Sequence, residues 1–359
     1  MKKNILLSLL IASSLYADLL DDIFKNAKVN GDITLHALTV SQKDPTHDIG
    51  FSNTSLGLGL QTDTYMGLSA AFLFRANNIV WENHNGNAEE AIGALLAIVN
   101  IEYQDEFMIF TVGRQEIELE WFEDLHQGAV FSTTLVEDTE IVLGYSTKIA
   151  YAVDDEIDKY EKIAVDGSYV LDIKNESIEG LMLNPYYMTV PKLFNAYGVK
   201  ADFESEYFGL TMHYAGTSEK EEEVKDGNIF HLEARAKYSN LIAGVGYIQT
   251  DEQGGIGTLD ELGDHLNPLE DGEYEEISVY EKDAKTRYLS LTYEGNELLL
   301  NMMYRSTDYN RDKHEKEFDV IVKYEIADDL MSEFVFAKIF ANENKDDQNK
   351  LMFLLSYEF

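Results

Sequence analysis

Segments of about ten residues in which apolar and polar side chains alternate recur along the chain, and one of them restricts the fold most. In FHLEARAKY, residues 230–238, the polar positions are His231, Glu233, Arg235 and Lys237. Successive side chains of a strand point to opposite faces, and a face with so many charges does not pack in a core. The segment therefore predicts a strand with water inside a barrel on its polar face and lipid on its apolar face.

Pairs of such segments are joined by short polar turns with an aromatic residue on each side. Tyr103 and Phe107 flank residues 104–106, and Phe203 and Tyr207 flank residues 204–206. Rings with polar tips favour the headgroup level of a membrane, so these pairs predict membrane-spanning hairpins. A large soluble sandwich with one solvated face is the alternative, but it does not explain the aromatic residues.

The strands predicted from this pattern number about 18, which is even, as an outer-membrane barrel requires. They are 29–40, 51–61, 65–75, 95–103, 107–114, 128–136, 139–151, 167–174, 179–188, 194–203, 207–215, 229–238, 241–249, 286–293, 298–306, 316–324, 331–340 and 351–359. Pro185 lacks the backbone donor that a strand interior needs, which leaves a count of about 16 open. The predicted fold is all-β, a transmembrane antiparallel up-and-down β-barrel over residues 29–359. Short turns alternate strictly with long polar connections, so we assign the turns to the periplasm and the long loops to the cell exterior.

The first residues have the features of a secretory signal peptide. Lys2 and Lys3 precede an apolar run at 5–15, and a small residue stands at Ala17. We expect cleavage after residue 17 and, from helical spacing of apolar residues, a short periplasmic helix at 18–28. The expected location of the protein is the outer membrane.

Charge and composition narrow the partners and the chemistry. Removing the two leader lysines changes the formal net charge from -38 to -40, and such a chain repels nucleic acid. The chain has no Cys, which excludes disulfides and thiol chemistry. The predicted partners are outer-membrane lipid and lipopolysaccharide.

Several motifs resemble OprD-type porins and the major outer membrane proteins of epsilon-class proteobacteria. They are KNAKVNGDITL at 25–35, TVGRQEIE at 111–118, DAKTRYLSLTYEGNELLLNMMY at 283–304 and the terminal YEF. The resemblance implies that Tyr357 and Phe359 form the signal read by the barrel assembly machinery, and that the chain is a homotrimer. It also implies that the loop at 115–127 folds into the lumen as a constriction, although the Pro often found after Gly-Arg-Gln in that family is missing here.

This loop carries most of the candidate pore residues. After Arg114 come five carboxylates, Glu116, Glu118, Glu120, Glu123 and Asp124. They would attract cations if they lined a narrow pore, whereas a solvated acidic loop on the cell surface is an equal alternative. Inward-facing positions of the predicted strands supply the bases Arg75, Lys200, Arg235, Lys237, Arg305 and Lys323. Acids and bases that face each other would give a transverse field across the pore.

The predicted function is passive diffusion of small hydrophilic solutes and ions, with weak to moderate cation preference. The alternatives are a barrel enzyme of the lipase or protease type and a surface adhesin or structural barrel; we expect no catalysis, because no His lies near a Ser in triad spacing. No cofactor is predicted. A hard cation such as Ca²⁺ could bind oxygen ligands in the acidic loop with Asp260, Glu261, Asp264, Glu270 and Asp271.

Overall fold

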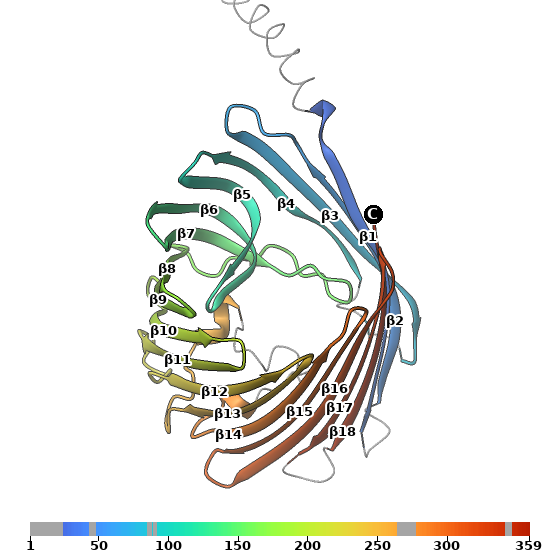
Figure 1. Cartoon of the computed structure of the whole chain (residues 1–359), viewed down its shortest axis with the longest axis vertical. Helices are drawn as coiled ribbons and strands as arrows, with labels where there is room; N and C mark the ends of the chain where they lie inside the picture. Colours follow the sequence, from blue (N-terminus) through green and yellow to red (C-terminus); the bar gives the residue numbers. More distant parts are fainter. Residues whose placement is uncertain (1–23, 43–47, 85–87, 89–91, 264–277, 342–346) are drawn as a thin grey trace, which may run out of the picture.

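The computed structural model describes residues 24–42, 48–84, 88, 92–263, 278–341 and 347–359, and nearly all of them belong to one β-sheet (Figure 1). The strands are β1 (Lys28–Gln42), β2 (Ile49–Gln61), β3 (Leu68–Glu82), β4 (Gly93–Gln104), β5 (Met108–Leu119), β6 (Phe122–Val136), β7 (Thr139–Ala150), β8 (Ser168–Ile178), β9 (Leu181–Val190), β10 (Phe194–Glu204), β11 (Phe208–Glu219), β12 (Asn228–Tyr238), β13 (Leu241–Thr250), β14 (Lys285–Glu294), β15 (Leu298–Tyr309), β16 (Lys313–Ala327), β17 (Leu330–Phe340) and β18 (Gln348–Glu358). Two short 3₁₀ helices, η2 (Leu259–Leu262) and η4 (Ser278–Tyr280), lie between β13 and β14. Among the residues described, no helix is long and apolar enough to span a membrane.

The sheet closes on itself into an 18-stranded barrel, as the sequence predicts. Every strand is antiparallel to the neighbours that precede and follow it in the chain, and β1 pairs with both β2 and β18. The closing ladder is continuous from Asp32 opposite Glu358 to Gln42 opposite Gln348. Closure gives every strand a paired neighbour on both sides, and a closed sheet is the form in which strands can cross hydrocarbon.

The distribution of side chains is inverted relative to a soluble protein. On β12 the polar positions point inward, where His231 is 2% and Glu233 is 5% exposed. On the outer face, Val245 of β13 lies opposite Leu289 of β14, and these side chains are 53% and 60% exposed. The apolar face thus has no protein cover, and lipid is the solvent that suits it.

Pro185 lies inside β9, and its neighbour supplies the hydrogen bond that proline cannot. The ladder between β8 and β9 is interrupted between the pairs Asp172–Tyr186 and Asn175–Leu183. In the gap, the Asn184 Nδ2 donates to the carbonyl oxygen of Ile173 at 3.1 Å. A side-chain amide therefore stands in for the missing backbone donor, and the barrel has 18 strands rather than 16.

The connections differ from the predicted strict alternation of short and long. At the end of the barrel where β1 begins and β18 ends, all connections are short turns. Three connections at the opposite end are also short. They are 120–121 between β5 and β6, 191–193 between β9 and β10, and 310–312 between β15 and β16. The first matters most, because the predicted loop at 115–127 is not a loop: β5 and β6 continue through it as a hairpin.

Two predictions lie outside the described residues. They are the leader at 1–17 and most of the helix at 18–28.

Candidate functional site

The β5–β6 hairpin leaves the barrel wall and bends into the interior (Figure 1). The ladder between β4 and β5 ends at Val99 opposite Arg114, whereas β5 and β6 stay paired to Leu119 opposite Phe122. Gly113 stands at the point of departure with φ +134°, where a Cβ would lie 2.2 Å from the Val99 carbonyl oxygen. Only glycine fits that backbone and that approach, so this residue determines where the strand leaves the wall.

The hairpin tip is buried against the inner wall of β8 to β13. Trp121 and Phe122 have no exposed surface, and they pack in a cluster that includes Tyr186 and Met188. The Trp121 ring lies 5.8 Å from that of Tyr280, in the connection between β13 and β14. Burial of large apolar side chains of this kind contributes roughly 1.5–3 kcal/mol each. The hairpin is therefore a docked element and not a mobile strap.

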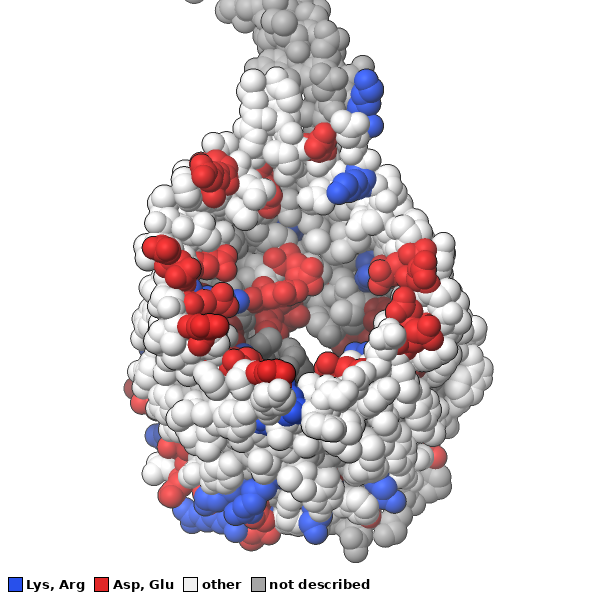
Figure 2. Space-filling view, viewed as in Figure 1, with Lys and Arg blue, Asp and Glu red and all other residues white. Residues whose placement is uncertain are grey.

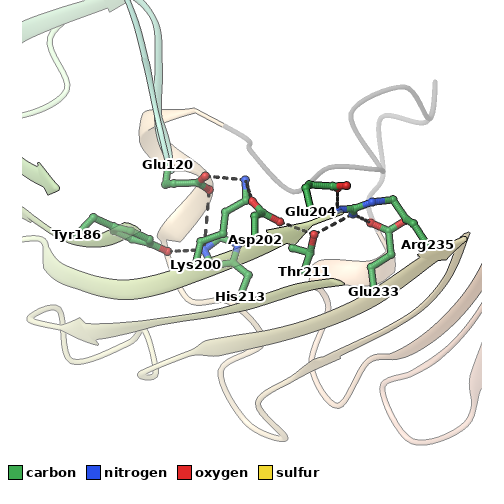
Figure 3. A network of polar contacts seen from close by, with 9 residues as sticks. All are labelled: Glu120, Tyr186, Lys200, Asp202, Glu204, Thr211, His213, Glu233 and Arg235. Atoms are coloured by element: carbon green, nitrogen blue, oxygen red, sulfur yellow. Dashed lines mark hydrogen bonds and ion pairs between the residues drawn. The ribbon is translucent and has the colours of Figure 1, made fainter. Parts of the chain in front are cut away.

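Glu120 at the tip makes the polar part of this contact (Figure 3). Its Oε1 accepts a hydrogen bond from the Lys200 Nζ of β10 at 2.7 Å. Its Oε2 lies 3.9 Å from the His213 Nε2, which is 2.8 Å from the Tyr186 hydroxyl. The carboxylate is 6% exposed, so its charge is compensated by Lys200 instead of facing water.

The network continues along β10 to β12 through alternating acids and bases (Figure 3). Arg235 donates to Glu233 at 2.6 Å and to Glu204 at 2.5 Å. Its Nη1 also donates to the Thr211 hydroxyl at 2.8 Å. Lys237 donates to the other Glu204 oxygen. The two bases of β12 thus share three carboxylate oxygens with no surplus positive charge.

The remaining predicted bases have carboxylate partners as well. Arg75 contacts both oxygens of Asp32, at 3.0 and 2.8 Å. Arg305 bonds Glu317 at 2.5 Å and Glu315 at 3.2 Å, and Lys323 lies 3.6 Å from Glu333. The partners of Arg305 and Lys323 lie on the adjacent wall strand, and the partner of Arg75 lies two strands away, on β1. The structure therefore shows local ion pairs rather than a separated row of acids facing a row of bases.

The predicted acids of the hairpin divide into two groups. Glu116 and Glu118 have exposed side chains, whereas Glu120 is buried in the pair described above. Glu123 and Asp124 are half-buried on β6. Arg114 bonds the Leu96 carbonyl oxygen at 2.9 Å and covers the Tyr160 ring at 4.5 Å, so it does not face the acids that follow it.

A second inward segment, residues 151–167 between β7 and β8, was not predicted. It runs from β7 to the inner face of β2 and β3, where the Asn53 and Asn77 side chains bind its backbone. Its sequence has neither alternation nor a turn signal that separates it from an external loop. The polar residues that hold it are distant in the chain, so no local pattern indicates its path.

Between the two inward segments and the wall of β1, β17 and β18 lies an open cavity of about 670 Å³. Six carboxylate residues line it, namely Asp32, Glu116, Asp124, Asp154, Asp329 and Glu358, and Arg75 is the one base among the described residues of its wall. Figure 2 shows the hollow with Asp and Glu side chains gathered around it. Burial and the neighbouring charge of Asp155 raise the pKa of Asp154, which belongs to the inward segment.

The acidic connection proposed to hold Ca²⁺ is only partly described. Asp260 and Glu261 lie in η2, where burial raises the pKa of both carboxyl groups. Asp264, Glu270 and Asp271 lie outside the described residues. Within the part of the chain that is described, no group of three or more His, Cys, Asp or Glu could hold a metal ion.

The C-terminal residues close the barrel. The Phe359 amide donates to the Gly31 carbonyl oxygen at 2.9 Å, and the Gly31 amide donates back to Phe359 at 2.9 Å. A Cβ on residue 31 would lie 2.8 Å from the Phe359 ring. The rings of Tyr357 and Phe359 stack 6.3 Å apart and are about half exposed. Gly31 therefore makes room for the terminal ring on the outer face.

Comparison with known proteins agrees with this architecture. A model of the Gram-negative porin family matches residues 5–346. The fold is similar to that of OccK3 (OpdO) of Pseudomonas aeruginosa, with a TM-score of 0.77, 11% identity and coverage of 95% of this chain and 97% of that one. It is also similar to OccAB4 of Acinetobacter baumannii, with a TM-score of 0.76, 14% identity and coverage of 92% and 98%. No curated protein sequence matches the chain.

Proposed function

This chain belongs to the Gram-negative porin family, and we propose that its barrel lets small hydrophilic solutes and ions diffuse across the outer membrane with a weak to moderate preference for cations. The family and the closed barrel make it an outer-membrane channel. The cation preference is our inference from the charges of the lumen.

One observation carries this inference. All six predicted wall bases contact carboxylates. Among the described residues, six carboxylate residues line the cavity between the inward segments, and its single base, Arg75, is paired with one of them, Asp32. A base in contact with a carboxylate presents a dipole, whose field falls off faster than that of a charge. The remaining negative charge therefore determines the sign of the potential that a permeating ion meets.

Only charges close to the path affect permeation strongly, because exposed charges are screened beyond about 8 Å at physiological salt. Glu116 meets this condition because it lines the cavity, and Glu118 lies two residues further along the same exposed face of the hairpin. Glu120 does not meet it, since Lys200 compensates it.

Planar-bilayer recording of the purified, folded protein tests the proposal. We expect stepwise conductance and, under a KCl gradient, a reversal potential with the sign of cation preference. The double variant Glu116→Gln and Glu118→Gln should lower that preference, and raised salt should weaken it. The matched control is Glu222→Gln with Glu223→Gln, which removes the same charge from exposed positions of the β11–β12 connection.

Two outcomes would contradict the proposal. Absence of conductance steps would remove the channel and favour an enzyme or a surface adhesin. An anion-preferring reversal potential would mean that the wall bases act on permeating ions despite their partners, and would point to small carboxylates as substrates.

The assembly of the barrel is a further part of the proposal. We propose that residues 1–17 direct export and that the barrel assembly machinery reads Tyr357 and Phe359 on the closing strand. Their exposed rings at the chain end support this, since such a signal must be accessible before the barrel closes. In the membrane the apolar outer face would contact lipid and lipopolysaccharide, and a homotrimer is the proposed assembly.

A further inference from the structure

The segment 151–167 crosses the barrel interior between strands that are not neighbours (Figure 1). It leaves the wall at the end of β7 and meets the inner faces of β2 and β3. There the Asn53 Nδ2 donates to the Asp154 carbonyl oxygen at 2.5 Å, and the Asn77 Nδ2 donates to the Val153 carbonyl oxygen at 2.8 Å. Both asparagines are buried, with 0% and 5% of their surface exposed.

Further contacts fix the rest of the segment. The Tyr160 hydroxyl donates to the Ala97 carbonyl oxygen of β4 at 2.7 Å. Ile157 packs in a buried cluster with Leu95 and Leu125, so the segment also touches the β5–β6 hairpin. The His36 Nδ1 lies 3.1 Å from the Asn53 Oδ1 and so holds that amide in place. The Asn53, Asn77 and Tyr160 contacts thus tie the segment to three wall strands, β2, β3 and β4, and its apolar cluster joins it to the hairpin.

We propose that residues 151–167 form a second constriction element and that Asp154 is a selectivity-determining residue of the channel, together with Glu116 and Asp124 of the hairpin. All three line the same cavity. This inference rests on the proposed function and adds to it a residue that no motif indicates. The Asn53 and Asn77 contacts bind the backbone on each side of the Asp154 side chain's attachment, which positions the carboxylate in the lumen.

The expected size of the effect follows from the distance between the carboxylate and a passing ion. At about 4 Å in bulk water, the attraction between unit charges corresponds to about a fivefold local enrichment, and salt reduces it. Asp154→Asn should therefore lower the cation-to-anion permeability ratio by about two- to fivefold. Asp158→Asn is the matched control, because Asp158 is exposed on the same segment and does not line the cavity.

Because the chain has no Cys, a single introduced Cys is the only thiol, and it can be modified after the channel has folded and inserted. Asp154→Cys is inserted into the bilayer and then treated with a thiosulfonate reagent that adds either a sulfonate or a trimethylammonium group. The sulfonate should restore cation preference, the trimethylammonium group should lower it further, and a thiol reductant should reverse both. The same treatment of Asp158→Cys should leave the reversal potential nearly unchanged.

The failure of this inference differs from that of the proposed function. In one case the wild-type channel prefers cations, and Glu116→Gln with Glu118→Gln lowers that preference. If Asp154→Asn then behaves as Asp158→Asn, and the labelled Cys channels do not differ, Asp154 does not determine selectivity. If the wild type itself lacks conductance or prefers anions, both proposals fall.

Discussion

The contact between Glu120 and Lys200 gives the sharpest prediction for the docked hairpin. Lys200→Met removes the positive partner and leaves a carboxylate that is 6% exposed. Removal of one partner of a buried ion pair costs about 3–5 kcal/mol. Since the Lys200 side chain keeps 17% of its surface exposed, the lower end, about 3 kcal/mol, is the appropriate figure.

This cost opposes the apolar contacts of the tip. Trp121 and Phe122 are fully buried, and together they stabilise docking by roughly 3–6 kcal/mol. The hairpin should therefore stay docked for most of the time in the variant. A loss of about 3 kcal/mol nevertheless raises the undocked population about 100-fold, because each 1.4 kcal/mol is about a factor of ten.

Single-channel recording measures this population as open-channel current noise and as brief conductance changes. Lys200→Met should show both, and Glu120→Gln combined with Lys200→Met should return most of the way to wild type, because no uncompensated charge remains buried. Lys192→Met is the control: this lysine pairs with Asp166 at 2.5 Å on the exposed surface, where ion pairs contribute little. Equal noise in wild type and Lys200→Met, or a double variant as noisy as the single one, would refute the role of the Glu120–Lys200 pair in keeping the hairpin docked.

Three further predictions follow from the wall, the inward segment and the chain end. Asn184→Ala removes the donor that replaces the N–H of Pro185 and should cost about 1–3 kcal/mol, read as a lower temperature of heat-induced unfolding on gels; an unchanged temperature would mean that the interrupted ladder needs no substitute. As pH falls, wild-type cation preference should decline while ordinary Asp groups are still ionised, because burial raises the pKa of Asp154, whose charged surroundings are Asp155, His36 and Arg75; Asp154→Asn should lack this early decline, and identical pH profiles would contradict it. Deletion of Phe359, or Phe359→Lys, should leave export intact but prevent insertion, and normal heat-modifiable protein in the outer membrane would speak against an assembly signal.

The strands were predictable because the alternation of polar and apolar residues is a local property that closure of the barrel does not change. The alternation places Glu233 on the polar face of its strand, and in the barrel that face points inward. Pro185 left a count of 16 open beside the correct 18, because the compensating donor is the adjacent Asn184 and a side-chain amide carries no signal of that role. The even number and the direction of the faces were thus accessible from sequence, and the repair of a ladder was not.

The hairpin shows where interpretation of a motif can miss a strand. Glu116 and Glu118 alternate with Ile117 and Leu119, which is the pattern of a strand with one apolar face. The resemblance to OprD-type porins implies a loop at 115–127, and the predicted strand therefore ends at residue 114. The pair between Glu120 and Lys200, 80 residues apart, depends on the register of the six strands from β5 to β10 and cannot be derived from local spacing.

Net charge predicts the sign of the lumen potential only in combination with the pairing. Carboxylates such as Glu120, Glu233 and Glu317 are almost fully buried, and burial of an uncompensated charge is costly. The wall bases Lys200, Arg235 and Arg305 offset that cost and so stabilise the wall itself. The chain has 66 acidic residues but only 28 Lys and Arg, so a surplus of carboxylates remains after the bases have paired in this way. Exposed charges act over about 8 Å at physiological salt, so that surplus affects permeation only where the fold places it beside the path. The proposed selectivity therefore depends on the two inward segments rather than on composition.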